Sequence, residues 1–204
     1  GSDYRLRYEK NDNLKITQAV AAYLADKEDV QVIMTRSDDT FLSLEERTTF
    51  ANQNNADYFV SLHRNTGEGN GVETWIRSDA DDKAQALAQN IMDNLDAAGI
   101  SRNRGVKKGT QKSESKDYYV NLHTNMPACI VELGFMNSPT DNQLFDANID
   151  SYAKAIGDAV LKTYESYGKD GADAKESVED VPGTEEQTST ETGTGTTGQV
   201  LQNT

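Results

Sequence analysis

The sequence predicts an α/β domain in which a mostly parallel sheet is covered by helices on both faces. Apolar runs of strand length alternate along the chain with longer segments of helical periodicity, an order typical of parallel strands joined by crossover helices. A chain of 204 residues is long enough for one such domain with a sizeable core. In sheets of this kind, ligands bind beyond the carboxyl ends of the strands.

The first half of the chain is expected to form two helices, each followed by a strand. Residues 11–27 carry apolar side chains at nearly helical spacing, with Asn11 or Asp12 available as the N-cap. Ser43 and Glu46 have the S-x-x-E spacing of a capping box, which marks the start of the second helix. The strands after these helices are expected at 30–36 and 57–63.

The second half continues the alternation. Residues 80–98 are predicted to be helical, and Gly99 suits the C′ position that ends such a helix. A long helix is expected over 140–166, broken or bent near Ala147 and Asn148. The strands of this half are expected at 71–77 and 128–135.

Composition divides the chain near residue 167. Residues 168–204 are rich in Gly, Thr, Ser and Glu and contain almost no large apolar side chain before Val200. Such a segment cannot bury enough surface to offset the entropy lost on ordering. The sequence therefore predicts a single folded domain over 1–167 and a disordered, acidic linker over 168–204.

Charge and composition exclude several classes of function. The formal net charge is −14 and no basic stripe is present, which argues against a nucleic-acid partner. No stretch reaches the roughly 18 apolar residues of a membrane span, so membrane insertion is not expected. Cys129 is the only cysteine, which excludes an intrachain disulfide and a cysteine-rich zinc site and suggests a small core residue.

Two polar residues near strand ends are candidates for chemistry. His63 closes the run ADYFVSLH and is either a hydrogen-bonding residue or a metal ligand. Glu132 interrupts the apolar run ACIVELGF, where an ionised carboxylate is unfavourable unless it is paired or metal-bound. It is either paired with Arg64 or Arg104, or a general base that faces a cleft.

A third candidate, Glu9, precedes the first helix and is either a solvated carboxylate or a ligand. One His and one Glu suit zinc, but catalytic zinc sites usually have three protein ligands. His123 is a weak candidate for the third, because it lies before the strand that carries Glu132.

Six segments occur in an order that resembles one enzyme family. They are YEKNDNLKI, VIMTRSDDTFLSLEERTTFAN, ADYFVSLHRN, GVETW, RNRGVK and NMPACIVELGFMNSPTDNQLF. Over about residues 4–166 the chain is similar to zinc-dependent N-acetylmuramoyl-L-alanine amidases of the amidase-3 type. These bacterial cell-wall hydrolases cleave the amide between the muramic acid lactyl group and the L-alanine of the stem peptide.

The resemblance implies roles for single residues. Glu9 and His63 correspond to zinc ligands, and Glu132 in E-L-G-F corresponds to the catalytic glutamate. Asn65 corresponds to the last residue of the S-[IL]-H-x-N motif and either contacts substrate or stabilises a turn. Arg64 is bulkier than the usual residue at its position, and either binds a substrate anion or pairs with Glu68 or Glu73.

Family members open with a strand that ends in Gly-His-Gly-Gly, whose histidine is the first zinc ligand. This chain begins Gly1-Ser2-Asp3-Tyr4, so we expect that strand and that ligand to be missing, the domain to be incomplete at its N-terminus, and zinc binding and turnover to be weak.

The resemblance also implies a setting. We expect peptidoglycan as the partner, zinc as the cofactor, a monomeric autolysin, and a secreted location in the cell wall, with the signal peptide outside this chain. The closing stretch GQVLQNT either begins a wall-binding domain after the linker or is a disordered end.

Two other functions stay open. One is a domain that binds peptidoglycan without cutting it, which the expected loss of a ligand favours and the presence of Glu132 opposes. The other is a different zinc peptidase, for which Arg64 would have to anchor a substrate carboxylate.

Overall fold

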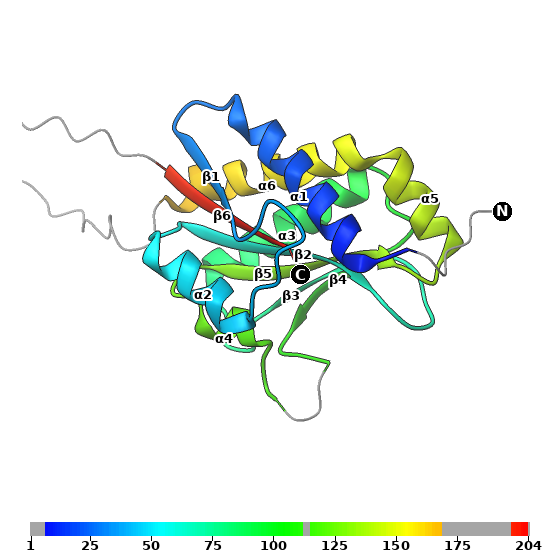
Figure 1. Cartoon of the computed structure of the whole chain (residues 1–204), viewed down its shortest axis with the longest axis horizontal. Coiled ribbons are helices and arrows are strands. Elements are labelled where there is room, and N and C mark those ends of the chain that lie inside the picture. Colours follow the sequence, from blue (N-terminus) through cyan, green and yellow to red (C-terminus); the bar gives the residue numbers. More distant parts are fainter. Residues whose placement is uncertain (1–6, 112–114, 169–196, 204) are drawn as a thin grey trace, which may run out of the picture.

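The computed structural model of the chain describes residues 7–111, 115–168 and the backbone of 197–203. These residues form a six-stranded sheet with helices on both faces (Figure 1). The helices are α1 (Glu9–Ala25), α2 (Leu44–Gln53), α3 (Asp82–Ala97), α4 (Tyr119–His123), α5 (Pro139–Ala147) and α6 (Ile149–Tyr167). The strands are β1 (Val30–Met34), β2 (Tyr58–Asn65), β3 (Val72–Ile76), β4 (Asn103–Lys108), β5 (Ala128–Phe135) and β6 (Thr197–Asn203).

The strand order is β1-β6-β2-β5-β3-β4, and all neighbouring strands are parallel except β3 and β5. The predicted fold class, a mostly parallel sheet with helices on both faces, is therefore confirmed. The four strands that apolar runs predict appear as β1, β2, β3 and β5, and the long C-terminal helix is broken at Asn148 between α5 and α6.

The two faces of the sheet carry cores of different size. Helices α1 and α3 each pack against α6, and the three cover the first face, where the larger apolar cluster lies. The shorter helices α2 and α4 contact each other on the second face, over a smaller cluster (Figure 1). Members of the smaller cluster are Ala51, Ala56, Phe59, Val120, Met126, Ala128 and Ile130.

Local signals in the sequence account for several helix ends. The capping box is present: Ser43 Oγ accepts from the Glu46 N–H, and the Glu46 carboxylate accepts from the Ser43 N–H. Gly99 follows the C-cap of α3 with φ of 90°, a backbone conformation that favours glycine. Cys129 is fully buried, as expected of a core residue.

The start of α1 differs from the prediction. The helix begins at Glu9, after Tyr8, and neither Asn11 nor Asp12 is its N-cap. Asp12 lies inside the helix because its carboxylate accepts hydrogen bonds from two arginines, Arg7 and Arg64.

The end of the chain also differs from the prediction. Residues 197–203, expected within a linker or at the start of another domain, form β6 between β1 and β2 (Figure 1, red). Residues 169–196 lie outside the described residues, so the predicted boundary at residue 167 and the linker stay predictions.

Candidate active site

Alternation along β2 decides which side chains meet. Successive residues of a strand point to opposite faces, so Ser61 and His63 point to the face that carries Phe59 and the smaller core. Strand β5 runs parallel to β2, and its Glu132 is the register partner of His63. Beside α4 and the first residue of α2, this face is hollowed into a pocket of about 590 Å³, whose lining includes both residues.

Glu9 reaches the same pocket from the first turn of α1. Its Oε1 lies 3.1 Å from Nδ1 of His63, and it also accepts from the Arg64 N–H and the Asn13 amide at 3.3 Å. Burial alone would raise the pKa of Glu9, but these hydrogen bonds and the charge of His63 hold the pKa below its ordinary value. Glu9 is therefore a carboxylate at neutral pH.

The pair of Glu9 and His63 suits a metal ion. Two ligands of one tetrahedral zinc ion lie about 3.3 Å apart, close to the separation of Oε1 and Nδ1. The other ring nitrogen of His63, Nε2, lies 2.9 Å from Oγ of Ser61. When Nε2–H donates to Ser61, Nδ1 keeps its lone pair and can act as a ligand.

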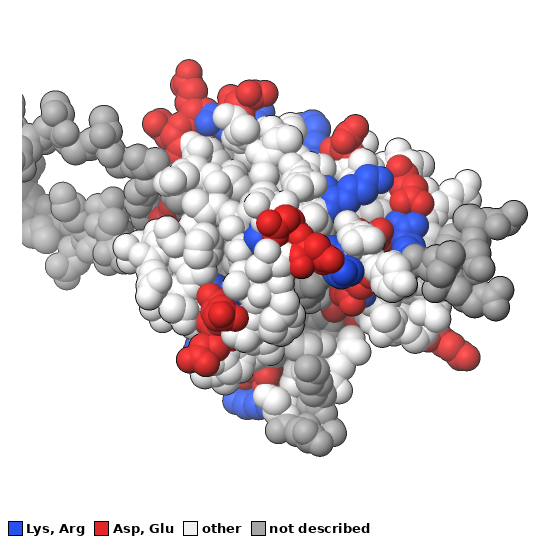
Figure 2. All heavy atoms as spheres, viewed as in Figure 1, with Lys and Arg blue, Asp and Glu red and all other residues white. Residues whose placement is uncertain are grey.

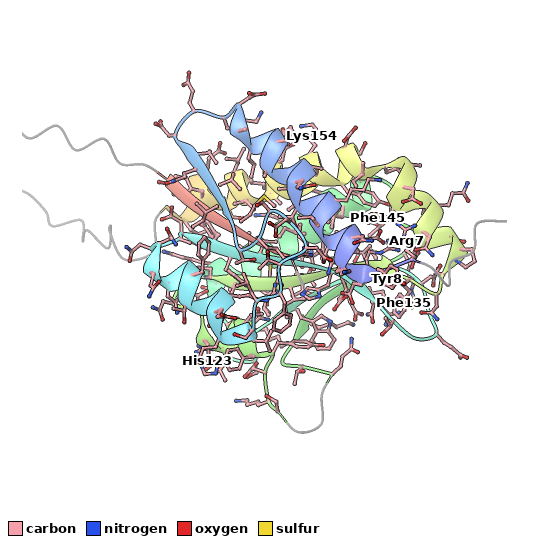
Figure 3. All side chains as sticks on the ribbon, viewed as in Figure 1. Arg7, Tyr8, His123, Phe135, Phe145 and Lys154 are labelled. Atoms are coloured by element: carbon pink, nitrogen blue, oxygen red, sulfur yellow. The ribbon has the colours of Figure 1, made fainter. Side chains whose placement is uncertain are left out.

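The ligand set is partial within the part of the chain that the structure describes. No group of three His, Cys, Asp or Glu side chains there is placed to hold a metal ion. His123 ends α4 and its ring lies against Tyr119, with centroids 4.0 Å apart. His123 lines the same pocket as Glu9 and His63, but Figure 3 shows it well away from Tyr8, the residue before Glu9, and no described group of three places it with the Glu9–His63 pair.

Glu132 has the environment expected of a proton-transfer group. Its Oε2 is buried and has no hydrogen-bond partner among the described residues, and neither Arg64 nor Arg104 pairs with it. Burial raises the pKa of Glu132 to about 7; His63 opposes the shift, and the carboxylates of Glu9 and Glu73 add to it. A cation held by Glu9 and His63 would lower this pKa again.

The Arg64 side chain lies on the opposite face, away from the pocket. Its guanidinium donates to Asp12 at 2.6 Å and to Asn142 at 2.7 Å, and it lies 4.4 Å from the centroid of the Phe145 ring. The side chain has no exposed area, which differs from the expected substrate contact and from the expected pairing with Glu68 or Glu73. In Figure 3, Phe145 lies beside Arg7, which also pairs with Asp12.

Asn65 lines the pocket, and both the oxygen and the nitrogen of its side-chain amide are hydrogen-bonded within the protein. Its Oδ1 accepts from the Thr66 N–H at 2.8 Å, and its Nδ2 donates to Oε1 of Glu73 at 3.2 Å. The turn-stabilising alternative therefore has direct geometric support, and a substrate contact stays a prediction.

Glu73, which the sequence suggests only as a possible partner of Arg64, accepts hydrogen bonds from the residues of the wall beside Asn65. Its carboxylate is 1% exposed and accepts from Asn65, Trp75, Arg104 and Gln111. It is the register partner of Glu132 across β3 and β5. The signal for Glu73 in the sequence is a charged residue inside the apolar strand GVETW. The signal for Ser61 is its position two residues before His63, on the same face of the strand.

On the face shown in Figure 2, acidic and basic side chains are interspersed among uncharged atoms. Within the described ranges, every helix is too short or too polar to cross a lipid bilayer.

Comparison with known proteins identifies the family to which the chain belongs. The chain is 34% identical to the protein YqiI of Bacillus subtilis over 78% of this chain and 74% of that protein. It is 29% identical to the probable cell wall amidase LytH of Staphylococcus epidermidis over 78% of this chain, which spans only half of LytH.

A solved structure, the N-acetylmuramoyl-L-alanine amidase of Clostridium difficile 630, superposes with a TM-score of 0.72 at 34% identity, over 79% of this chain and 87% of that one. The sequence pattern of the amidase-3 family, described as N-acetylmuramoyl-L-alanine amidase, matches residues 2–162. The chain therefore belongs to the amidase-3 family of N-acetylmuramoyl-L-alanine amidases.

Proposed function

We propose that the domain hydrolyses the amide bond between the lactyl group of N-acetylmuramic acid and the L-alanine of the stem peptide in peptidoglycan. The observation that carries the proposal is the meeting of Glu9, His63 and Glu132 in one pocket at the carboxyl ends of parallel strands. The family of the chain supports peptidoglycan as the substrate.

Glu132 would be the catalytic residue. Its free carboxylate oxygen would take a proton from the attacking water and return it to the alanine nitrogen as the C–N bond breaks. The hydroxide equivalent of that water goes to the lactyl carbonyl carbon, so the products are a free carboxylic acid and a stem peptide with a free amino group.

Glu9 and His63 would hold zinc, with Ser61 orienting the histidine ring. When bound, zinc supplies a Lewis acid for the scissile carbonyl and the attacking water. Because the described residues contribute two protein ligands where catalytic sites usually have three, we expect weak zinc affinity and low turnover. We expect the protein to be a monomeric, secreted autolysin of the cell wall.

The test is mass spectrometry of peptidoglycan incubated with the purified chain over a series of zinc concentrations. Release of stem peptides that begin with L-alanine supports the proposal, and their absence at every zinc concentration contradicts it. Zinc bound per chain, measured by elemental analysis, should fall in His63→Ala and stay unchanged in His123→Ala, which lies outside the pair.

A second candidate function is binding to peptidoglycan without cleavage, which the partial ligand set favours. Co-sedimentation with insoluble peptidoglycan separates the two. Retention in the pellet without release of peptides at any zinc concentration would favour the binding domain.

A further inference from the structure

The pocket has a second wall that the proposed chemistry does not use. Leu44 at the start of α2 and Tyr119, Leu122 and His123 on α4 line the same pocket as the proposed hydrolytic residues. We call these four residues the α2–α4 wall. In the described part of the chain, six large apolar side chains are exposed, and three of them, Leu44, Tyr119 and Leu122, lie on this wall. Apolar groups exposed together beside polar ones mark a binding surface.

The α2–α4 wall is held in place by the protein itself. Asn52 of α2 joins the two helices: its Nδ2 donates to the carbonyl of His123 at 2.9 Å, and its Oδ1 accepts from the Asn125 N–H at 2.8 Å. Val120, on the buried side of α4, packs in the smaller core. The rings of Tyr119 and His123 lie with their centroids 4.0 Å apart. A surface that is already ordered loses less entropy when a ligand binds.

The proposed substrate has two chemically different arms at the bond that is cleaved. One arm is an uncharged N-acetylated sugar ring, and the other is a peptide that carries carboxylate and amino groups. The C–H groups on one face of a pyranose ring are apolar, and they pack on the face of an aromatic ring, where the π electrons carry negative charge. The α2–α4 wall offers an exposed aromatic ring in Tyr119 and apolar groups beside it in Leu44 and Leu122.

The charged arm fits a second hollow of about 420 Å³ better than it fits this wall. Three residues line both the hollow and the pocket, so the two adjoin: Asn65, Thr66 and Gln111. The hollow also has charges of both signs, from Glu68, Glu73, Arg104 and Lys107. Glu73 and Arg104 pair with each other at 2.7 Å. A peptide that carries both carboxylate and amino groups matches such a lining.

We propose that the α2–α4 wall is a sugar subsite, on which the N-acetylmuramic acid ring packs while the stem peptide extends toward β4. The inference rests on peptidoglycan being the substrate, as proposed above, and adds the direction in which the substrate lies across the pocket. Tyr119 is then a specificity-determining residue, which favours an amide attached to a sugar over the same amide without one.

The first test is an NMR titration of the full chain with the tetramer of N-acetylglucosamine, which has the sugar ring but no lactyl-peptide bond. Tyr119→Ala should raise Kd by about tenfold, because the ring that packs on the sugar is lost. Tyr119→Phe keeps the ring and should bind as the wild type does. Tyr167→Ala is the matched control and should leave Kd unchanged, since Tyr167 is exposed at the end of α6, outside the pocket.

Absence of binding by the wild type would overturn the subsite, as would equal binding by the wild type and Tyr119→Ala. If Tyr119→Ala does not fold, Leu122→Ala takes its place and should also raise Kd, because Leu122 is exposed on the same wall. Light scattering checks another occupant: a dimer that Leu122→Ala or Tyr119→Ala dissociates, without sugar binding, would assign the wall to a second copy and overturn the proposal.

The second test compares hydrolysis of a muropeptide that has its N-acetylmuramic acid with hydrolysis of the same peptide carrying only the lactyl group, with zinc added. Tyr119→Ala should lower kcat/KM for the muropeptide by about tenfold and leave kcat/KM for the lactyl-peptide unchanged. Equal losses on both substrates would indicate a structural role for Tyr119 and overturn the subsite.

The two tests separate this inference from the proposed hydrolysis. Binding of the sugar tetramer that depends on Tyr119, without cleavage of either substrate, would support the subsite and contradict the hydrolysis. Cleavage of both substrates at equal rates, without binding of the tetramer, would overturn the subsite and leave the hydrolysis standing.

Discussion

The two faces of strand β2 differ in what their side chains do. On one face Tyr58, Val60 and Leu62 are buried in the larger core under α1, α3 and α6. On the other face, Phe59 packs in the smaller core, but Ser61 and His63 line the pocket. Residues one position apart in the sequence therefore have different environments.

The difference follows from the lengths of the covering helices. α1 and α6 are 17 and 19 residues long, whereas α2 and α4 have 10 and 5 residues. The short helices leave a pocket on their face, which is lined by the carboxyl ends of β2 and β5, by α4 and by the residues before α4. Ser61 and His63 on this face line the pocket, whereas Arg64 on the other face pairs within the protein.

Glu132→Gln should give the largest effect, on the pocket face. The amide cannot accept the proton of the attacking water, so release of stem peptides should fall by about 10²–10⁴-fold. The free energy of unfolding should not fall, since the variant removes a buried carboxylate that lacks a hydrogen-bond partner. Mass spectrometry of digested peptidoglycan and urea unfolding measure the two quantities.

Glu45→Gln on the exposed first turn of α2 is the matched control and should leave the release of stem peptides unchanged and lower the free energy of unfolding by at most about 1 kcal/mol. If Glu132→Gln keeps full activity, the base must be another group. A loss of activity that comes with a lower free energy of unfolding would instead point to a structural role for Glu132.

Arg64→Met should give the next effect, and only in stability. Removing the guanidinium leaves the buried Asn142 without this donor and Asp12 with Arg7 as its remaining arginine partner, which should lower the free energy of unfolding by about 1–3 kcal/mol. Burial lowers the pKa of Arg64, which means that burial disfavours the charged guanidinium. The negative charge of Asp12 opposes this effect. Urea denaturation at pH 7 is the measurement.

Arg77→Met is the matched control because Arg77 pairs with Asp79 at the surface. Its loss should change the free energy of unfolding by less than about 1 kcal/mol. Equal effects of the two substitutions would contradict the contrast between the faces, as would a loss of substrate affinity in folded Arg64→Met.

The sequence predicts most of the fold because its signals are local. Four strands follow from apolar runs, and the start of α2 follows from Ser43 and Glu46. Strand β4 and helix α4 are missed: NRGVKK has charged residues at an edge of the sheet, and YVNLH is too short to show a period. β6 is missed because its pairing depends on partners far away in the sequence.

The candidate site shows the same limit. The position of His63 at a strand end predicts that it can reach a ligand, and the sequence also offers Glu9 and Glu132 as candidates, to which the resemblance assigns roles. The predicted place of Arg64 at the site is wrong, because successive residues of a strand point to opposite faces and Arg64 directly follows His63. Its partners Asp12 and Asn142 come from two helices that periodicity alone does not place together.

Cys129→Ser should have a smaller effect on the core face. Cys129 is the register partner of Val60, and it is fully buried in the larger core, which raises the pKa of its thiol. A serine hydroxyl there would be buried among apolar side chains, where it is unfavourable unless it is hydrogen-bonded. The substitution should lower the free energy of unfolding by about 1–3 kcal/mol. The activity of the folded protein should not change, because the pocket lies on the other face.

Cys129→Ala is the control that removes the sulfur without adding a polar group. It should be less destabilising than Cys129→Ser when both are compared by urea unfolding. Rapid reaction of wild-type Cys129 with a thiol reagent under native conditions would show that this face opens more readily than its burial indicates.

Ser43→Ala should have the smallest effect, on the short helix beside the pocket. The change removes the hydroxyl that accepts from the Glu46 N–H and should lower the free energy of unfolding by about 1 kcal/mol. Ser166→Ala, near the end of α6, is the control, since its hydroxyl only donates to a carbonyl of its own helix. Hydrogen exchange should show the loss of protection confined to α2, because this helix packs on the smaller core and can loosen alone. If protection falls across α1 and α6 as well, the two faces unfold as one unit, and the contrast between them concerns chemistry but not stability.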